Sequence, residues 1–188
     1  MGLRITFDLS NEDLRHFRLI MAEASSASAQ LSSEEIISAT KDLIAEVRTA
    51  SVPEFIQQRL SLLELLTRMV TDEEWRLPED EKRRILNALA YFTEPEDLIP
   101  DHIPGLGFLD DAIMIELVVR ELKHELDAFR DFCDYRHRES LQKKAGSGDS
   151  ITRATWLKTR RQELQSRMRR RRNSDVKKLK RRSPLSLF

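Results

Sequence analysis

The sequence predicts an all-α protein, a helical bundle of about five helices followed by a basic C-terminal tail that is partly disordered or helical. Of the 188 residues, 34% are charged and only 6% are aromatic, and the chain holds 5 glycines and 6 prolines. This composition is typical of charged helical bundles rather than of β-rich proteins. Apolar side chains also recur at intervals of three or four residues along much of the chain, as they do on the buried faces of helices.

The first two predicted helices begin at serines that are followed three residues later by an acid, Ser10 with Asp13 and Ser32 with Glu35. In this pattern the hydroxyl and the carboxylate accept hydrogen bonds from amides that a first helical turn leaves without partners. An apolar stripe follows each serine at helical spacing. We therefore expect one helix after Ser10 and a second after Ser32.

Three further helices follow in the same way. A capping pattern at Ser51 opens a third helix, whose wide apolar stripe over residues 56–70 should be mostly buried. Pro78 suits the first turn of a fourth helix, which ends near the proline-rich segment 94–107. A long fifth helix begins near Leu109, and we expect its far end to protrude or fray where charge replaces apolar residues.

The net charge of zero hides a separation of charge along the chain. Residues 1–142 hold 16 Lys and Arg against 29 Asp and Glu, a net charge of −13, whereas residues 143–188 hold 16 against 3, a net charge of +13. Such a separation reports on partners, or on docking of one half against the other. A Gly/Ser-rich stretch at residues 145–150 lies where the net charge changes sign, and its composition is typical of a flexible linker. We expect an acidic helical bundle over residues 1–144, a linker over 145–150 and a basic tail over 151–188.

The lone cysteine and the hydropathy pattern bear on location. Cys133 can form no internal disulfide, and the N-terminus lacks the apolar stretch of a secretory signal. Charged residues interrupt every stretch before it reaches the roughly 18 to 20 apolar residues needed to span a bilayer. We expect a cytoplasmic protein without a transmembrane segment.

Residues 91–112 form a proline-, glycine- and aspartate-rich motif, Tyr-Phe-Thr-Glu-Pro-Glu-Asp-Leu-Ile-Pro-Asp-His-Ile-Pro-Gly-Leu-Gly-Phe-Leu-Asp-Asp-Ala. Its distinctive positions are Pro95, Asp97, Leu98, Ile99, Pro100, Asp101, Ile103, Pro104, Gly105, Gly107, Asp110 and Asp111. On these residues the segment resembles the YkvA-like family, domain of unknown function 1232. The resemblance implies a helical hairpin rather than a reaction, and many members of that family are described as membrane proteins.

The four aspartates of the motif, Asp97, Asp101, Asp110 and Asp111, allow two interpretations. Their carboxylates could converge on a hard cation such as Mg²⁺, which takes oxygen ligands. Alternatively, aspartates beside prolines and just before a helix cap exposed amides and favour the positive end of the helix dipole. We expect the structural role, with no bound metal or cofactor.

The histidines and the cysteine also favour a non-enzymatic protein. Glu121 and His124 have the acid-x-x-His spacing found in di-metal bundles, but their charged neighbours indicate a solvated helix face. Cys133 lacks a companion His/Asn signature, which indicates a buried or half-buried thiol rather than a nucleophile.

Arginine and lysine dominate the predicted tail. The planar guanidinium group suits phosphate oxygens. An apolar stripe formed by Trp156, Leu157, Leu164 and Met168 allows residues 152–172 to form a basic amphipathic helix on binding. Three interpretations remain open: contact with a nucleic-acid backbone, adsorption to anionic lipid, and docking of the tail on the acidic body. The candidate nucleic-acid-binding residues are Arg153, Lys158, Arg160, Arg161, Arg167, Arg169, Arg170, Arg171, Arg172, Lys177, Lys178, Lys180, Arg181 and Arg182.

The last residues, Leu-Ser-Leu-Phe, resemble the peptide that bacterial replication and repair proteins present to the sliding clamp. Leu185, Leu187 and Phe188 would then be the anchors that fill an apolar groove. The same residues fit a carboxylate-terminated peptide for a PDZ-type groove, or a terminus without a partner.

These observations favour a non-enzymatic, DNA-associated accessory protein. Its helical body would bind a protein partner, its tail the backbone of DNA, and its C-terminal peptide the sliding clamp. Two alternatives stay open, a membrane-surface protein with a lipid-binding tail and a metal-dependent enzyme built on the aspartate cluster.

Overall fold

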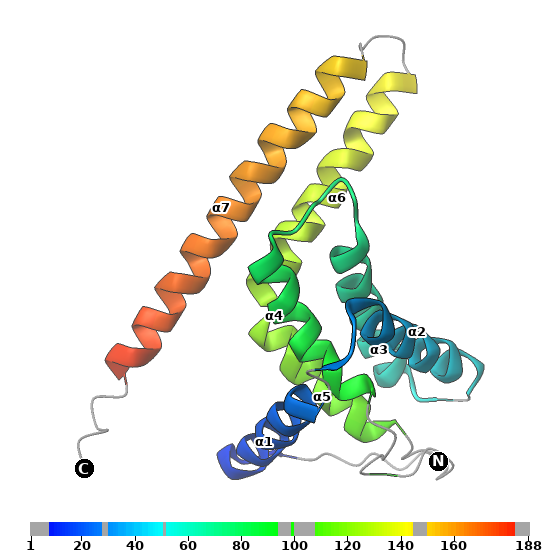
Figure 1. Ribbon diagram of the computed structural model, residues 1–188, viewed down its shortest axis with the longest axis vertical. Coiled ribbons are helices and arrows are strands. Elements are labelled where there is room, and N and C mark those ends of the chain that lie inside the picture. Colours follow the sequence, from blue (N-terminus) through cyan, green and yellow to red (C-terminus); the bar gives the residue numbers. More distant parts are fainter. Residues whose placement is uncertain are drawn as a thin grey trace, which may run out of the picture. The chain divides into compact units, whose positions relative to one another are not determined.

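The computed structural model describes residues 8–27, 30–50, 52–93, 99, 108–144 and 150–182, without the side chains of residues 142–144, 150–152 and 179–182. Within these residues the protein is all-helical, as the sequence predicts, and no strand is present. The described ranges contain seven α-helices (Figure 1), so the prediction of about five was too low. The helices are α1 (Asn11–Ala27), α2 (Ser33–Thr49), α3 (Glu54–Thr71), α4 (Glu79–Leu89), α5 (Leu109–Glu121), α6 (Lys123–Lys144) and α7 (Ser150–Arg182), with a 3₁₀ helix, η2 (Ala90–Thr93), directly after α4.

Two of the seven helices account for the difference from the prediction. The predicted long fifth helix is interrupted at Leu122, where α5 ends and α6 begins. Leu122 is fully buried and its carbonyl oxygen still accepts a hydrogen bond from the amide of Leu126 at 2.9 Å. Neither glycine nor proline marks this break, and the apolar pattern continues across it. The sequence pattern therefore predicts one continuous helix. The second addition is α7, a continuous helix of 33 residues where the prediction has a partly disordered or helical tail.

The capping patterns at the first two helices are confirmed. The amide of Ser10 donates to Asp13 Oδ2 at 2.8 Å, and the amide of Asp13 donates to Ser10 Oγ at 3.2 Å. At α2 the amide of Ser32 donates to Glu35 Oε2 at 2.7 Å, while the amide of Glu35 donates to Ser32 Oγ at 3.2 Å. Ser51, the third predicted cap, lies outside the described residues.

Contacts between Cα atoms divide the chain into two compact units. The first unit comprises Met1–Thr67 and Pro78–Val118. In it, α1, α2 and α4 all contact η2, and the predicted burial of α3 is confirmed by Ile56, Leu60, Leu63 and Leu66. An ion pair of 3.1 Å joins Arg59 of α3 to Glu116 of α5.

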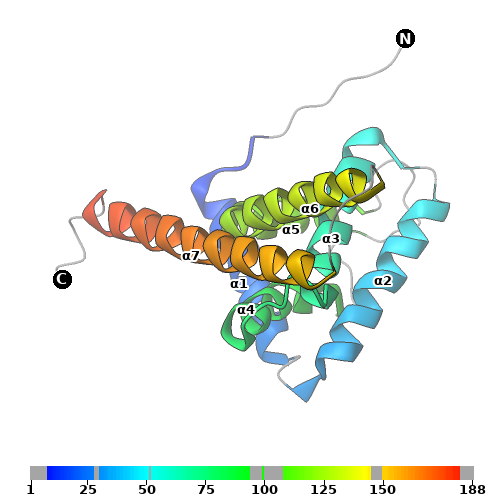
Figure 2. The same ribbon diagram turned by 90° about the horizontal axis from the view of Figure 1, so that it is seen from above.

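The second unit comprises Arg68–Leu77 and Val119–Phe188. Its main feature is an antiparallel pair of helices, α6 and α7, which lie side by side in both views (Figures 1 and 2). Contacts therefore group residues 150–182 with α6, whereas the prediction places a domain boundary at 145–150. Which part of the chain folds independently stays a prediction.

Candidate nucleic-acid interface

The predicted apolar stripe of α7 is real, and α6 covers it. Leu157, Leu164 and Met168 are 6%, 1% and 1% exposed, at spacings of seven and four residues, which is the periodicity of two helices packed at a small angle. Trp156, which the prediction included in the stripe, is 58% exposed. The helix therefore buries a narrow face and leaves Trp156 on its surface.

A polar residue within the buried face, Gln165, holds the segment between α3 and α4. Its Nε2 donates to the carbonyl oxygens of Trp75 at 2.9 Å and Arg76 at 3.3 Å. Arg161 Nη1 donates to the preceding carbonyl, that of Glu74, at 3.0 Å. Three consecutive carbonyls in the turn after α3 thus find their donors on α7, which satisfies groups that are costly to leave without a partner.

The indole ring of Trp75 forms the centre of this contact. It is fully buried, and its ring centroid lies 5.8 Å from that of Phe129 and 5.1 Å from that of Phe132, both on α6. Aromatic pairs at such separations stabilise a core beyond the area that they bury. Residues 72–76, α6 and α7 therefore share one packed core.

Charge pairs run along the seam between α6 and α7. Arg172 Nη1 lies 2.8 Å from Glu125 Oε1, and the side chain of Glu125 is fully buried. Later in α6, Asp131 lies 3.9 Å from Arg167 of α7. At the start of α6, Lys123 and His124 pair with Asp175, which lies nearer the end of α7. The later a residue lies in α6, the earlier its partner lies in α7, as the antiparallel arrangement requires.

The Asp175 carboxylate pairs with two α6 side chains. Lys123 Nζ lies 3.0 Å and His124 Nε2 lies 2.9 Å from Asp175 Oδ2. Hydrogen bonds from Lys123 and then from His124 lower the pKa of Asp175 to about 2. The side chain of His124 is only 14% exposed, so the prediction of a solvated face was wrong at this residue. The sequence could not show this, because Asp175 lies 51 residues away.

Five of the predicted arginines are half-buried and have partners within the chain. Besides Arg161, Arg167 and Arg172, these are Arg153, which lies 3.1 Å from Glu74, and Arg160, which lies 2.8 Å from Glu163. Burial lowers the pKa of Arg161, and the charge of Arg76 adds to the effect. These arginines contribute to holding α7 in place.

A second group of predicted residues faces solvent. Lys158, Arg170, Arg171 and Lys177 are exposed and Arg169 is half-buried, and in the part of the chain that the structure describes none of them forms an ion pair. We call these five residues the exposed basic set. Lys178 lies 3.7 Å from Asp175, whereas the side chains of Lys180, Arg181 and Arg182 lie outside the described residues.

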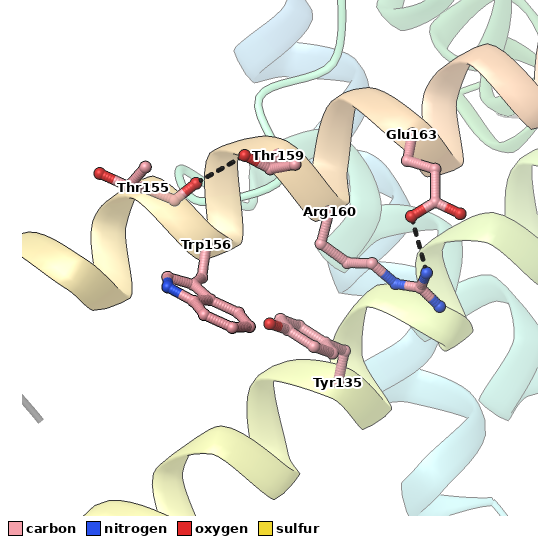
Figure 3. Close-up of a pocket in the computed structure, with 6 residues that line it drawn as sticks. All are labelled: Tyr135, Thr155, Trp156, Thr159, Arg160 and Glu163. Carbon is pink, nitrogen blue, oxygen red and sulfur yellow. Dashed lines mark hydrogen bonds and ion pairs between the residues drawn. The ribbon is translucent and has the colours of Figure 1, made fainter. Parts of the chain in front are cut away.

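An open groove of about 370 Å³ lies on the same two helices. Tyr135 of α6 and Trp156 of α7 point toward one another across it (Figure 3). The Arg160 guanidinium lies 5.6 Å from the centroid of the Tyr135 ring, within the range of a cation–π contact. Its other lining residues are Thr155, Thr159, Arg160 and Glu163. Sequence reasoning missed this groove because Tyr135 and Trp156 belong to different predicted segments.

The aspartate motif is described only at its end. Asp110 and Asp111 occupy the first turn of α5 and are 2% and 6% exposed. Asp110 Oδ2 accepts a hydrogen bond from the amide of Ile99 at 3.0 Å, which ties the motif to the start of α5. Among the described residues no three His, Cys, Asp or Glu side chains are grouped to hold a metal. The remaining predicted positions of the motif, Pro95, Asp97, Pro100, Asp101, Pro104, Gly105 and Gly107, lie outside the described residues.

Cys133 and the C-terminal peptide complete the predicted features. Cys133 is a half-buried thiol, and burial is the largest influence raising its pKa. The C-terminal peptide with Leu185, Leu187 and Phe188 lies outside the described residues. In the described ranges no helix has both the length and the apolar character needed to cross a membrane.

The segment formed by α4, η2, the motif and most of α5 has known relatives. Residues 81–117 match the family described as protein of unknown function DUF1232, in agreement with the predicted resemblance. The chain is also 45% identical over 42 residues to the "Uncharacterized membrane protein YkvA" of Bacillus subtilis (strain 168). That match covers 22% of this chain and 40% of the relative's length. No solved structure matches the chain.

The class that fold and comparisons define is therefore an all-helical protein with a DUF1232-like segment. The family match ends at residue 117, before the helix pair of α6 and α7. The basic residues of α7 thus lie outside the region that resembles the family.

Proposed function

We propose that the protein is a non-enzymatic accessory protein whose helix α7 binds the phosphate backbone of nucleic acid, while its acidic helical body binds a protein partner. The exposed basic set would make the phosphate contacts. Lysine and arginine side chains that neutralise phosphates release condensed counterions, so such binding needs no sequence-specific contact.

The observation that carries this proposal is that the apolar residues of the α7 stripe are buried while many basic residues of the helix are exposed. Its apolar stripe at Leu157, Leu164 and Met168 is already buried against α6, and several of its arginines are paired within the chain. Apart from the exposed Trp156 and Val176, what α7 offers to a partner is therefore charge and not an apolar face. A helix that adsorbs to lipid inserts its apolar face, so the docked state of α7 favours a backbone of phosphates over a bilayer.

Retention of the full-length protein on duplex DNA of arbitrary sequence, measured at rising salt concentration, tests the proposal. Replacing Arg169, Arg170 and Arg171 by glutamine should weaken retention and reduce the slope of log affinity against log salt by roughly 0.9 for each phosphate that the protein no longer neutralises. A control variant removes three exposed charges from the first unit, at Arg15, Arg18 and Lys41. It carries the same net charge and should bind like the parent.

Equal weakening in the two variants would show that net charge alone matters and would overturn the assignment to α7. No retention of the parent protein at low salt, with binding by the isolated peptide 150–182, would show that docking on the body has neutralised the helix. Either result rejects the proposed interface.

The membrane-surface alternative has one observation in its favour, that the Bacillus relative is named as an uncharacterized membrane protein. Because the family match, residues 81–117, lies within the first unit, a membrane contact would involve this unit rather than α7. Flotation with anionic vesicles, run on the same variants, separates the alternatives. Vesicle binding that survives replacement of Arg169, Arg170 and Arg171, without DNA retention, would favour the membrane.

For the C-terminal peptide we propose a groove-binding role, with Leu187 and Phe188 as anchors for the sliding clamp. Two buried apolar side chains contribute about 1.5–3 kcal/mol each before ordering costs, and DNA binding through α7 would raise the effective concentration of the peptide at the clamp. Replacing both residues by alanine should abolish clamp binding and leave DNA retention intact. Unchanged clamp binding in the double variant would refute the tether, and loss of binding after one added residue would indicate a PDZ-type groove.

A further inference from the structure

Trp156 is a large aromatic residue that the fold does not use as core. It is 58% exposed on α7, whereas Trp75, the other tryptophan, is fully buried. Exposing an indole ring forgoes the free energy that its burial would supply. Trp156 also does not lie alone, because it forms one wall of the groove shared with α6 (Figure 3).

The opposite wall is a stacked pair. The Arg160 guanidinium lies 5.6 Å from the centroid of the Tyr135 ring, and Arg160 donates to Glu163 Oε2 at 2.8 Å, so this wall is held in place. Trp156 takes no part in the ring contacts found among the described residues. The space between Trp156 and the stacked pair is thus open to a ligand, and its volume of about 370 Å³ lies in the range of small-molecule sites, on the order of 300–1,000 Å³.

The charges around the groove suit an anionic ligand. Arg160 belongs to the lining and Lys158 is exposed on the same helix two residues after Trp156, whereas Arg153 is paired with Glu74. Glu163, the acid in the lining, accepts from Arg160 at 2.8 Å and from Arg167 at 2.6 Å, and these hydrogen bonds lower its pKa. Its charge is therefore matched by two guanidinium groups, which reduces its repulsion of a phosphate.

We propose that this groove binds an unpaired nucleobase of single-stranded nucleic acid by stacking it on Trp156, beside the Tyr135 and Arg160 wall, while the exposed basic set follows the backbone. The inference rests on the proposed function and specifies its substrate. Aromatic and guanidinium planes interleaved with positive charge are the means by which proteins hold single strands. A base within a duplex is already stacked on both faces and paired at its edge, so only an unpaired base can enter.

The experiment titrates full-length protein with an oligothymidylate single strand and with a mixed-sequence duplex of equal length, at one salt concentration, and follows tryptophan emission. Stacking on Trp156 should quench its emission, and buried Trp75 should not respond. Trp156→Ala should weaken single-strand binding about 5- to 150-fold and leave duplex binding unchanged, whereas Trp156→Phe, which retains a ring, should bind nearly as well as the parent. The control Val176→Ala changes another exposed apolar residue of α7, 46% exposed, and should alter neither affinity.

Selective loss of single-strand binding in Trp156→Ala, with the helical circular dichroism signal retained, supports the inference. Equal weakening of single strand and duplex, or unchanged single-strand affinity while retention still depends on Arg169, Arg170 and Arg171, overturns it and leaves the proposed function standing. If the parent protein binds neither nucleic acid, both proposals fail. Quenching or a blue shift of Trp156 on anionic vesicles alone would overturn the inference in favour of a lipid surface.

Discussion

Replacing Leu164 by alanine should destabilise the second unit by about 2–3 kcal/mol. Leu164 is 1% exposed and lies in the middle of the α7 stripe, one residue before Gln165. Deleting buried leucine atoms costs about 2–5 kcal/mol, from reduced burial and from the cavity that remains. We expect the lower half of this range, because a site between two helices and a short segment relaxes more easily than the centre of a large core.

Urea denaturation followed by Trp75 emission measures this change. The background variant Trp156→Phe leaves Trp75 as the single reporter, and Trp75 lies at the contact that Gln165 makes. With a slope of about 1–3 kcal/mol per molar urea, the transition midpoint should fall by roughly 0.7–3 M. Lys158→Ala, an exposed change on the same helix, should alter stability by less than about 0.5 kcal/mol.

Equal midpoints for Leu164→Ala and its parent would refute the reasoning. Such a result would mean that α7 adds nothing to the stability of the core around Trp75, and that residues 151–188 behave as the separate tail of the sequence prediction. A destabilisation well above about 5 kcal/mol would instead show that the unit has no stable form without the Leu164 side chain.

Three further results are expected. Ser32→Ala should lower stability by about 1 kcal/mol in denaturant unfolding, because it removes one half of the capping box; no measurable change would contradict that role. Asp175 should titrate near pH 2 in an NMR titration of its carboxyl carbon, since Lys123 and His124 hold its charged form; a midpoint at its ordinary 3.8 would contradict the pairing. Because this pKa is lowered on folding, the pair contributes stability above about pH 4 that is lost as the pH falls toward 2. Cys133 should react more slowly with iodoacetamide at pH 8 than free cysteine does, because burial raises its pKa, and a rate equal to that of free cysteine would count against a half-buried thiol.

Much of the helical structure could be predicted because its causes are local. The capping boxes at Ser10 and Ser32 join residues three positions apart, and an apolar stripe depends on neighbours three or four positions apart. Capping boxes and apolar stripes can therefore both be recognised in a single sequence. The break at Leu122 was missed because no local signal accompanies it.

The candidate site was predicted in part for the same reason. The sequence identifies the basic residues of α7, but it does not show which arginines face solvent. Arg172 meets Glu125, 47 residues away, and Gln165 meets the Trp75 carbonyl, 90 residues away. Only folding decides that these side chains hold the helix while Arg170, Arg171 and Lys177 stay exposed.

The sequence by itself determined that this protein is helical, that its charges are separated, and that α7 has one apolar face. The tertiary structure decided what covers that face and therefore what remains on the surface. The physical reason is that an amphipathic pattern specifies a need for burial without specifying the partner, and α6, which packs along α7, meets that need. The same packing sets Tyr135 opposite Trp156, and thereby creates the groove in which we place an unpaired base.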